Sequence, residues 1–432
     1  MASNTHFETV DCSEISDVWT GQSAGPCLYT HGQDQFVAFY AADRSITAGH
    51  RRLGDTEWTL AQVSTQRNSV WDHHNELALT VDDDDHLHLV GDMHVDPLNY
   101  FRTTEPLDVT SFERVESMVG SDEDRTTYPS FLRGPDDELI VKYRHGGSGA
   151  GNWIYNVYHH GDRDWDRLLD TPLTRGGDRA SAYPQGPTLG PDDYYHLVWC
   201  WRDNPGAQTN HDLYYVRSGD LRNWETARGE PVTLPIEFHQ GELIDPVPPY
   251  GGLLNSRIRL GFDTQDRAVV SYMKFDPDGN TQIYNARCES HGWNVYKTSD
   301  WDYRYSFGGR GSLGTPLQFS GVEIEPDGRL SQTYEHPKYG SGKWILEEET
   351  LEATEWFSPW HRYPETLETT ESTDPKMRVN WATDSGDSPD ETEYLLRWEA
   401  RDPQHGGDSE SAEVPEPTAL ECYQFESVDH AQ

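Results

Sequence analysis

The stretch HNELALTVDDDDHLHLVGDMH, from His74 to His94, places two histidines on either side of an acidic turn centred near Asp84. If this stretch is an antiparallel hairpin, positions symmetric about the turn are cross-strand neighbours. The two imidazoles should then meet at the end of the hairpin away from the turn.

Two later stretches repeat this arrangement. YPSFLRGPDDELIVKYR, from Tyr128 to Arg144, is symmetric about Asp136, and YPQGPTLGPDDYYHLVWCWR, from Tyr183 to Arg202, is symmetric about the turn at Pro191-Asp192. As hairpins they would place each tyrosine opposite its arginine. The three units together predict one rim that carries two imidazoles, two phenols and two guanidiniums, without a conspicuous pair of carboxylates.

The same unit recurs along the chain as an acidic or glycine-rich turn, an aromatic strand and a later Trp or Phe. Six such strands are visible, and strands at 394–400 and 419–427 would complete a seventh unit with the N-terminal segment. Short strands that repeat about every 50 residues are typical of β-propellers. We predict an all-β, seven-bladed β-propeller whose N- and C-terminal strands share the closing blade; an array of β-sandwiches is the alternative.

We predict one domain over residues 1–432. The polar, acidic segment near 402–416 is expected to be a loop of the disordered type. No stretch predicts a helix of useful length.

The charge is strongly acidic throughout the chain. Its formal net charge is −41, from 75 acidic and 34 basic residues, and only six of the basic residues are lysines. This composition is typical of a halophilic protein, because the Debye length of ~3 Å at 1 M salt mutes self-repulsion. An acidic tail on a mesophilic protein explains it less well, since the acids are spread along the chain. Nucleic acid is not an expected partner, because its phosphates would be repelled.

The five cysteines have no C-x-x-C spacing, so neither a disulfide framework nor a zinc ribbon is predicted. The N-terminal stretch lacks the pattern of a signal peptide, and no run reaches membrane-spanning length. We expect a cytoplasmic monomer with no membrane partner, and secretion with a removed signal stays open.

The histidines and tyrosines are the candidates for proton transfer. His74 and His94 are paired by symmetry, with Asn75 beside the first, whereas His86 and His88 lie near the turn and are interpreted as structural. A structural role is the alternative for His74 and His94 too. Tyr128 and Tyr183 each precede proline, which favours an extended conformation at the start of a strand. The alternative is that both tyrosines fill the space between blades.

The arginines are the candidates for binding an anion. Arg144 opens the glycine-rich stretch RHGGSGAGN, which allows close approach of a ligand, and Arg202 follows WCW. Arginine can grip a carboxylate with two parallel hydrogen bonds. Alternatively, Asp203 could pair with Arg202 in a structural bridge.

Further substrate contacts are expected from loops at the rim, at His239 and Lys274. The acidic stretch at 81–86 lacks the spacing of an EF-hand, so it is interpreted as a solvated turn, and no metal ligands are assigned.

At these stretches the chain resembles the BNR-repeat β-propeller polysaccharide lyases of the L-rhamnose-α-1,4-D-glucuronate lyase and ulvan lyase group. The resemblance covers roughly residues 65–350 and includes LGFDTQDRAVVSYMKFDPDGNTQIYNAR. It implies catalytic roles for His74, His94, Tyr128 and Arg144, and substrate binding by Arg202, Tyr183, Asn75, His239 and Lys274.

The resemblance implies β-elimination at a uronate in a polysaccharide or oligosaccharide, with rhamnose–glucuronate as the favoured linkage. Ulvan cleavage, an α-L-rhamnosidase-type hydrolysis of the same linkage and non-catalytic glycan binding are the alternatives. No cofactor is required for the chemistry. Some members of the group hold calcium and others zinc; since no zinc cluster is evident here, a structural Ca²⁺ is the metal to consider.

Overall fold

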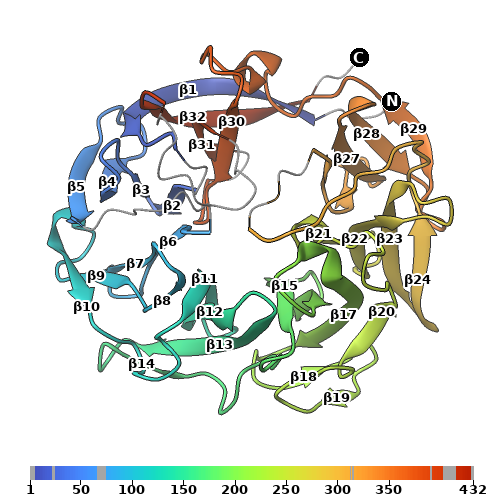
Figure 1. Ribbon diagram of the computed structural model, residues 1–432. Coiled ribbons are helices and arrows are strands. Elements are labelled where there is room, and N and C mark those ends of the chain that lie inside the picture. The colour runs from blue at the N-terminus through green and yellow to red at the C-terminus, as the bar shows by residue number, and fades with distance from the viewer. Residues whose placement is uncertain are drawn as a thin grey trace.

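The fold is all-β. The computed structural model describes residues 5–21, 25–65, 74–311, 313, 316–389, 392–401 and 415–429. Within these ranges there is no α-helix, and the 3-10 segments are Val109–Ser111, Ala207–Thr209, Asn255–Arg257 and Glu365–Glu368. The sheets are arranged in a ring, each with one edge near the centre and the other at the periphery (Figure 1). Most of the predicted loop near 402–416 lies outside the described residues.

Two sheets come first along the ring, and both are four-stranded. One has the order β2-β3-β4-β5, and the next has the order β6-β7-β9-β10. Their strands are β2 (Cys27–His31), β3 (Asp34–Tyr40), β4 (Ile46–Arg52), β5 (Thr59–Ser64), β6 (Leu77–Val81), β7 (Leu87–Gly91), β9 (Tyr100–Thr103) and β10 (Phe112–Val115).

The next part of the ring is an eleven-stranded sheet made of two antiparallel meanders. A single parallel pairing, Gly151 with Ser181, joins the meanders, and the short strand β8 adds to the inner edge of the first one. The strands are β8 (His94–Asp96), β11 (Thr126–Arg133), β12 (Leu139–Gly147), β13 (Ala150–His159), β14 (Asp164–Arg167), β15 (Ser181–Leu189), β16 (Tyr195–Arg202), β17 (Asn210–Ser218), β18 (Trp224–Glu225), β19 (Pro231–Val232) and β20 (Glu242–Asp245).

The remaining sheets complete the ring. One has the order β21-β22-β23-β24, and the next contains β25 to β29. Their strands are β21 (Ile258–Phe262), β22 (Ala268–Phe275), β23 (Thr281–Glu289), β24 (Gly292–Lys297), β25 (Gln318–Phe319), β26 (Glu323–Ile324), β27 (Leu330–His336), β28 (Gly340–Leu346) and β29 (Ala353–Phe357).

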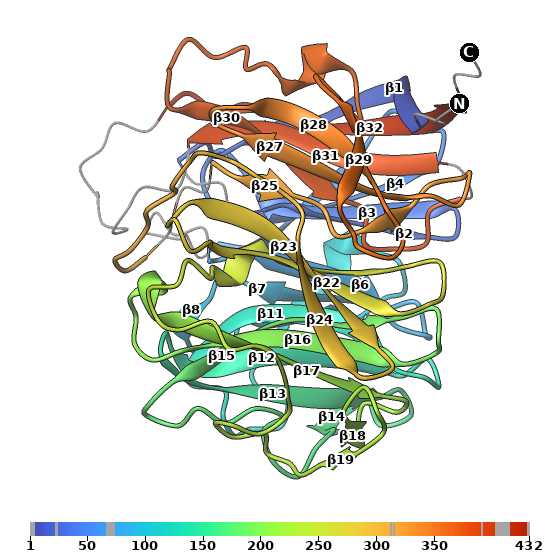
Figure 2. The same cartoon turned by 90° about the vertical axis from the view of Figure 1, so that its right-hand side faces the viewer.

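The last sheet joins the two ends of the chain. Its order is β1-β32-β31-β30, and β1 (Thr5–Val18) pairs antiparallel with β32 (Thr418–Asp429). The other two strands are β30 (Met377–Thr383) and β31 (Thr392–Arg401). Figure 2 shows the same ring from the side, with the strands of successive sheets running across the view.

The core lies between neighbouring sheets rather than at the centre of the ring. One cluster joins β3 and β4 to β6 and β7, and another joins the two meanders of the long sheet through Trp153, Trp199 and Trp201. All eight residues of β16 are buried, because one face of this strand packs against the first meander of the long sheet and the other against β21, β22 and β23. Large aromatic side chains can fill such gaps between sheets, which accounts for the low aliphatic and high aromatic content of the sequence.

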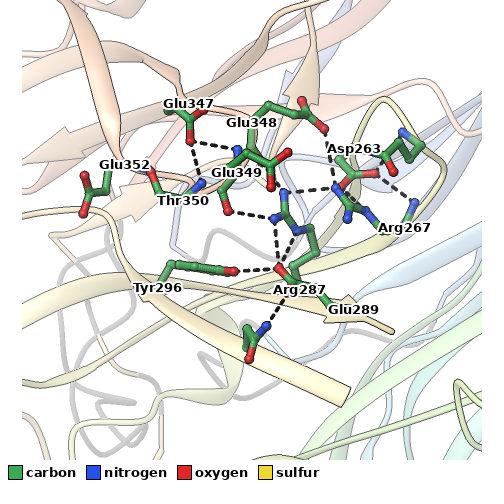
Figure 3. Close-up of polar contacts among 12 residues, drawn as sticks. Asp263, Arg267, Arg287, Glu289, Tyr296, Glu347, Glu348, Glu349, Thr350 and Glu352 are labelled. Carbon is green, nitrogen blue, oxygen red and sulfur yellow. Dashed lines mark hydrogen bonds and ion pairs between the residues drawn. The ribbon is translucent and has the colours of Figure 1, made fainter. Parts of the chain in front are cut away.

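Polar groups also link neighbouring sheets. Arg287 on β23 is fully buried and reaches the turn between β28 and β29 (Figure 3). Its Nη2 donates to a carboxylate oxygen of Glu289 and to the backbone carbonyl of Glu349, at 2.9 and 2.8 Å. Its Nη1 donates to the carbonyl of Glu348 and lies 3.6 Å from a carboxylate oxygen of Asp263. The charge of this buried guanidinium is therefore matched by acids of the protein itself.

Candidate active site

The two histidines meet as the sequence predicts. The hairpin of β6 and β7 has Leu77 opposite Gly91, so continuing the register places His74 opposite His94. The imidazole rings stack, with centroids 4.3 Å apart and an interplanar angle of 24°. His94 begins β8, which leaves its own hairpin and pairs with β11 at Thr127. The histidine pair therefore lies beside the first tyrosine of the next sheet.

Tyr128 lies next to the histidines but not in the predicted conformation. Its ring meets that of His74 edge-on, with centroids 5.6 Å apart. Its φ is +56°, so the expected extended conformation is wrong. The register shifts between Thr127 and Ser130, and Arg144 pairs with Thr127 rather than with Tyr128. A positive φ is rare outside glycine, and such strained residues cluster at functional sites.

The predicted register is also wrong in the third hairpin. Arg202 pairs with Ser181, and Tyr183 pairs with Cys200, because the register shifts between Gln185 and Thr188. The two side chains still meet diagonally, with the guanidinium carbon of Arg202 4.1 Å from the ring centre of Tyr183. Diagonal neighbours on one face of a sheet are within reach of long side chains.

Both arginines are buried and converge on one phenol. Arg144 has no exposed surface. Its Nη1 donates to the Tyr183 hydroxyl at 3.4 Å, and its Nη2 donates to the Thr127 hydroxyl at 3.1 Å. The Nη1 of Arg202 donates to the same Tyr183 hydroxyl at 3.2 Å. The guanidinium of Arg144 also lies 4.8 Å from the ring centre of Tyr128.

Neither guanidinium is matched by a carboxylate of the described chain. The Nε of Arg202 donates to Asn210 at 2.7 Å, and its Nη2 donates to Asn255. The structural bridge from Arg202 to Asp203 does not form, because Asp203 instead lies 3.1 Å from the Nε2 of His211. The Nε of Arg144 is buried without a partner. Two buried cations held only by neutral groups favour the binding of an anion.

Of these side chains, His74, Tyr128, Tyr183 and Arg202 line a cavity of about 630 Å³, whereas Arg144 and His94 lie outside its lining. Its polar and aromatic lining consists of His74, Glu76, Tyr128, Ser130, Lys142, Trp153, Tyr183, Gln185, Arg202, Asn255, Ser256, Arg257 and Gln318. The volume is in the usual range for a small-molecule site.

The cavity shifts the pKa of three of these groups. Burial raises the pKa of the Tyr128 phenol above its usual range, although nearby Arg144 acts in the opposite direction. Burial is the larger of the two effects. Burial also lowers the pKa of Lys142 to about 8. The carboxyl group of Glu76 opens to the cavity but is surrounded by protein, and this desolvation raises its pKa to about 7.

The sequence matches the model described as a BNR repeat-containing family member over residues 34–301, which is more than half of the chain. The chain belongs to this BNR-repeat family. No curated protein sequence matches it significantly.

Solved structures of polysaccharide lyases match nearly the whole chain. The polysaccharide lyase Uly1 matches with a TM-score of 0.64 and 12% identity, covering 99% of this chain and 100% of that one. A PL25 ulvan lyase matches with a TM-score of 0.61 and 12% identity, covering 96% and 95%. The same kind of lyase bound to -[GlcA(1-4)Rha3S]- also gives 0.61 and 12%, covering 95% and 94%. At this identity the likeness shows a shared fold.

In this BNR-repeat chain, three predicted substrate contacts do not line the cavity. His239 is exposed on a loop and packs against Phe238. Lys274 is paired with Asp245 at 2.5 Å. Asn75 is buried, and its amide nitrogen donates to Asp92 at 3.3 Å.

The cavity also contains residues that the sequence analysis did not select. Glu76 lies two positions after His74, and Lys142 two positions before Arg144, so each can share a face with a predicted residue. Asn255 and Arg257 come from the 3-10 segment that precedes β21, and no spacing in the sequence connects them to the histidines.

The predicted structural histidines are buried away from the cavity lining. His88 lies 3.0 Å from a carboxylate oxygen of Asp82 and accepts or donates a hydrogen bond with Tyr100 at 2.8 Å. His86 contacts the carbonyl of Thr103 at 2.9 Å. Both rings are held within hydrogen-bonded networks of the protein.

Among the residues that the structure describes, no group of three or more His, Cys, Asp or Glu could hold a metal ion. No step of the chemistry is therefore assigned to a metal.

Over the residues that the structure describes, no helix is long and apolar enough to span a bilayer.

Proposed function

We propose that this chain is a polysaccharide lyase that cleaves L-rhamnose-α-1,4-D-glucuronate linkages by β-elimination at the uronate. The observation that carries the proposal is the pair of buried guanidiniums, Arg144 and Arg202, which meet at the Tyr183 hydroxyl without a carboxylate partner in the described chain. A uronate carboxylate has the charge and the planar shape that this pair can bind. The shared fold with polysaccharide lyases supports the same reaction class.

The fold that we infer for this function is a seven-bladed propeller. Counting the two meanders of the eleven-stranded sheet separately gives seven sheets around the ring, and β1 and β32 share one of them. The cavity then lies at the inner ends of the blades, where strands from several blades contribute side chains.

The elimination requires three tasks. Arg144 and Arg202 would bind the uronate carboxylate and stabilise the negative charge that develops when the proton at carbon 5 is removed. A basic side chain takes that proton, and its electron pair forms the double bond between carbons 4 and 5. The bond from carbon 4 to the glycosidic oxygen breaks, and an acid protonates the departing oxygen.

The surroundings of the candidate groups suggest how these tasks are divided. His74 lines the cavity and stacks on His94, and a neutral imidazole is a suitable base near neutral pH. Because burial raises the pKa of Tyr128, its phenol keeps its proton and suits the role of the acid. We therefore propose His74, supported by His94, as the base and Tyr128 as the acid.

The other candidates give different products. An α-L-rhamnosidase-type hydrolase would leave a saturated uronate, and a glycan-binding propeller would leave the linkage intact. Ulvan would be cleaved by the same elimination but carries sulfated rhamnose. Hydrolysis usually requires two carboxyl groups, and Glu76 is the single carboxyl in the described cavity lining, which favours elimination.

The test is the formation of an unsaturated uronate. Purified protein is incubated with gum-arabic-type glycans and, separately, with ulvan, while ultraviolet absorbance is followed and products are weighed by mass spectrometry. Elimination gives an absorbing product whose two fragments sum to the mass of the substrate. Fragments whose masses sum to that of the substrate plus one water, without new absorbance, would instead indicate a hydrolase.

The expectations of a cytoplasmic location, a halophilic host, a monomeric state and a structural Ca²⁺ remain proposals. Gel filtration with light scattering in low and high salt, and metal analysis of the purified protein, would test the last three directly.

A further inference from the structure

Glu76 is the only carboxyl group in the described lining of the cavity. The other ionisable groups of the lining are cationic, cation-forming or phenolic: His74, Tyr128, Lys142, Tyr183, Arg202 and Arg257. A lone acid inside a site that suits anions has a charge opposite to that of its surroundings. The proposed elimination assigns no task to this carboxyl group.

The backbone aims Glu76 into the cavity. Asn75 and Leu77 on either side of it are buried, whereas Glu76 is exposed and lines the cavity together with His74. This alternation is that of an extended chain. Gly91 lies opposite Leu77, and a Cβ at Gly91 would come within 2.5 Å of the Glu76 carbonyl. The missing side chain at Gly91 therefore permits the close approach that positions Glu76.

Among the described residues, the carboxyl group of Glu76 has no hydrogen-bond or ion-pair partner. The negative charge of an ionised Glu76 contributes to the raised pKa of the Tyr128 phenol. His74, Tyr128 and Lys142 line the same cavity as Glu76, and Tyr40 and Asp92 form hydrogen bonds with the neighbouring Asn75. His94 stacks on His74, and Arg144 lies over Tyr128. Lys142 is already engaged: its Nζ donates to the carbonyl of Gly186 and lies 5.5 Å from the ring centre of Trp153.

We infer that Glu76 determines specificity at the sugar next to the uronate: it accepts hydrogen bonds from free hydroxyl groups of that sugar and excludes a sulfate ester there. This inference rests on the proposed function and narrows its substrate class to unsulfated rhamnose–glucuronate glycans. An ionised carboxylate is an acceptor only, so it pairs with hydroxyl groups. A sulfate at the same place would bring two negative charges together, and such repulsion is a common means of discrimination.

The experiment compares Glu76→Gln with the unchanged protein on two matched substrates, rhamnose–glucuronate oligosaccharides with and without sulfate on the rhamnose. Both kcat/KM and Kd are measured for each. We expect the unchanged protein to prefer the unsulfated substrate by roughly 10- to 100-fold at pH 8. In Glu76→Gln this ratio should fall toward one, mainly because the sulfated substrate improves. Glu113→Gln, an exposed change on the outer strand β10, removes the same charge and should keep the ratio.

A second readout separates this role from a merely structural one. The preference should grow between pH 6 and pH 8, because the pKa of Glu76 is raised to about 7 and the repelling carboxylate forms over that interval. In Glu76→Gln the ratio should not change with pH. A structural role would alter both substrates equally at every pH.

Three results would overturn the inference: an unchanged ratio in Glu76→Gln, a preference of the unchanged protein for the sulfated substrate, or the same pH dependence in both proteins. A preference for the sulfated substrate would indicate that Lys142, and not Glu76, determines which charge the site selects. If neither substrate gave an unsaturated product, the proposed function would fail. The Kd values of the two oligosaccharides would still decide the role of Glu76.

Discussion

Arg144 and Arg287 are both fully buried arginines on central strands of their sheets, yet their surroundings are opposite. Arg287 contacts the carboxylates of Glu289 and Asp263 and two backbone carbonyls (Figure 3). Arg144 has two hydroxyl partners, a buried Nε without a partner and no carboxylate in the described chain. One site neutralises its charge and the other leaves it available.

The difference separates a structural role from a ligand-binding one. A buried cation without a counter-ion costs stability, whereas a cation already paired gains little from a further anion. Arg287 links β23 to the turn between β28 and β29 and so joins two sheets. Arg144 contacts Tyr128 and Tyr183, which line the cavity, so a substrate bound there can supply the missing charge. Burial alone does not distinguish the two arginines, and the partners do.

The largest effect is expected for the histidines, because His74 and His88 differ in their surroundings as Arg144 and Arg287 do. His74 lines the cavity, while His88 is held by Asp82 and Tyr100. His74→Ala or His94→Ala should lower kcat/KM by ~100- to 10,000-fold without unfolding the protein, because proton transfer is lost. His88→Ala should instead lower the melting temperature and largely keep the kcat of the folded fraction. Equal loss of kcat in all three variants would remove the distinction.

The next effect concerns the unpaired arginine. Arg144→Met keeps the volume and removes the charge, so kcat/KM on the uronate substrate should fall by about 100- to 1,000-fold. The melting temperature should stay unchanged or rise, since no carboxylate is left behind. Arg144→Lys should restore only part of the activity, because an ammonium cannot bind a carboxylate as a planar fork. Full activity in Arg144→Met would rule out its role in elimination.

The same substitution at the paired arginine should give the reverse result. Arg287→Met removes the cation that Asp263 and Glu289 share, so Asp263 keeps Arg267 alone as its cation and Glu289 keeps hydrogen bonds from Tyr296 and Asn294. Losing one partner of a buried pair costs up to about 3–5 kcal/mol. Urea unfolding should show this loss, while the kcat of the folded fraction should match that of the unchanged protein. A stable Arg287→Met variant with impaired kcat would contradict the structural assignment.

The smallest effect concerns salt. Raising KCl from about 0.1 M to about 1 M shortens the Debye length from ~10 to ~3 Å, so repulsion among exposed acids weakens. We expect a melting temperature several degrees higher for the unchanged protein. The deficit of Arg287→Met should persist, because buried pairs are screened much less. Salt that abolished this deficit would indicate that the cluster is solvated.

Much of the fold could be predicted because strands and turns are local. The hairpins expected at 128–144 and 183–202 form the antiparallel pairs β11–β12 and β15–β16. The symmetry of the first hairpin correctly brought His74 and His94 together. It failed for Tyr128 and Tyr183, because a bulge shifts the register by a residue or more and no count of residues reveals it.

The sequence by itself determined the alternation, the turns and the residue types that meet at the inner ends of the sheets, since these depend on neighbours along the chain. Only the tertiary structure decided which charges are matched. The partners of Arg287 include the backbone carbonyl of Glu349, 62 residues away, whereas no carboxylate of the described chain pairs with Arg144. It also placed Glu76 in the cavity and His239 and Lys274 outside it. Contacts between sheets depend on how the whole ring packs. A short stretch of sequence therefore does not determine which residues of other sheets it will meet.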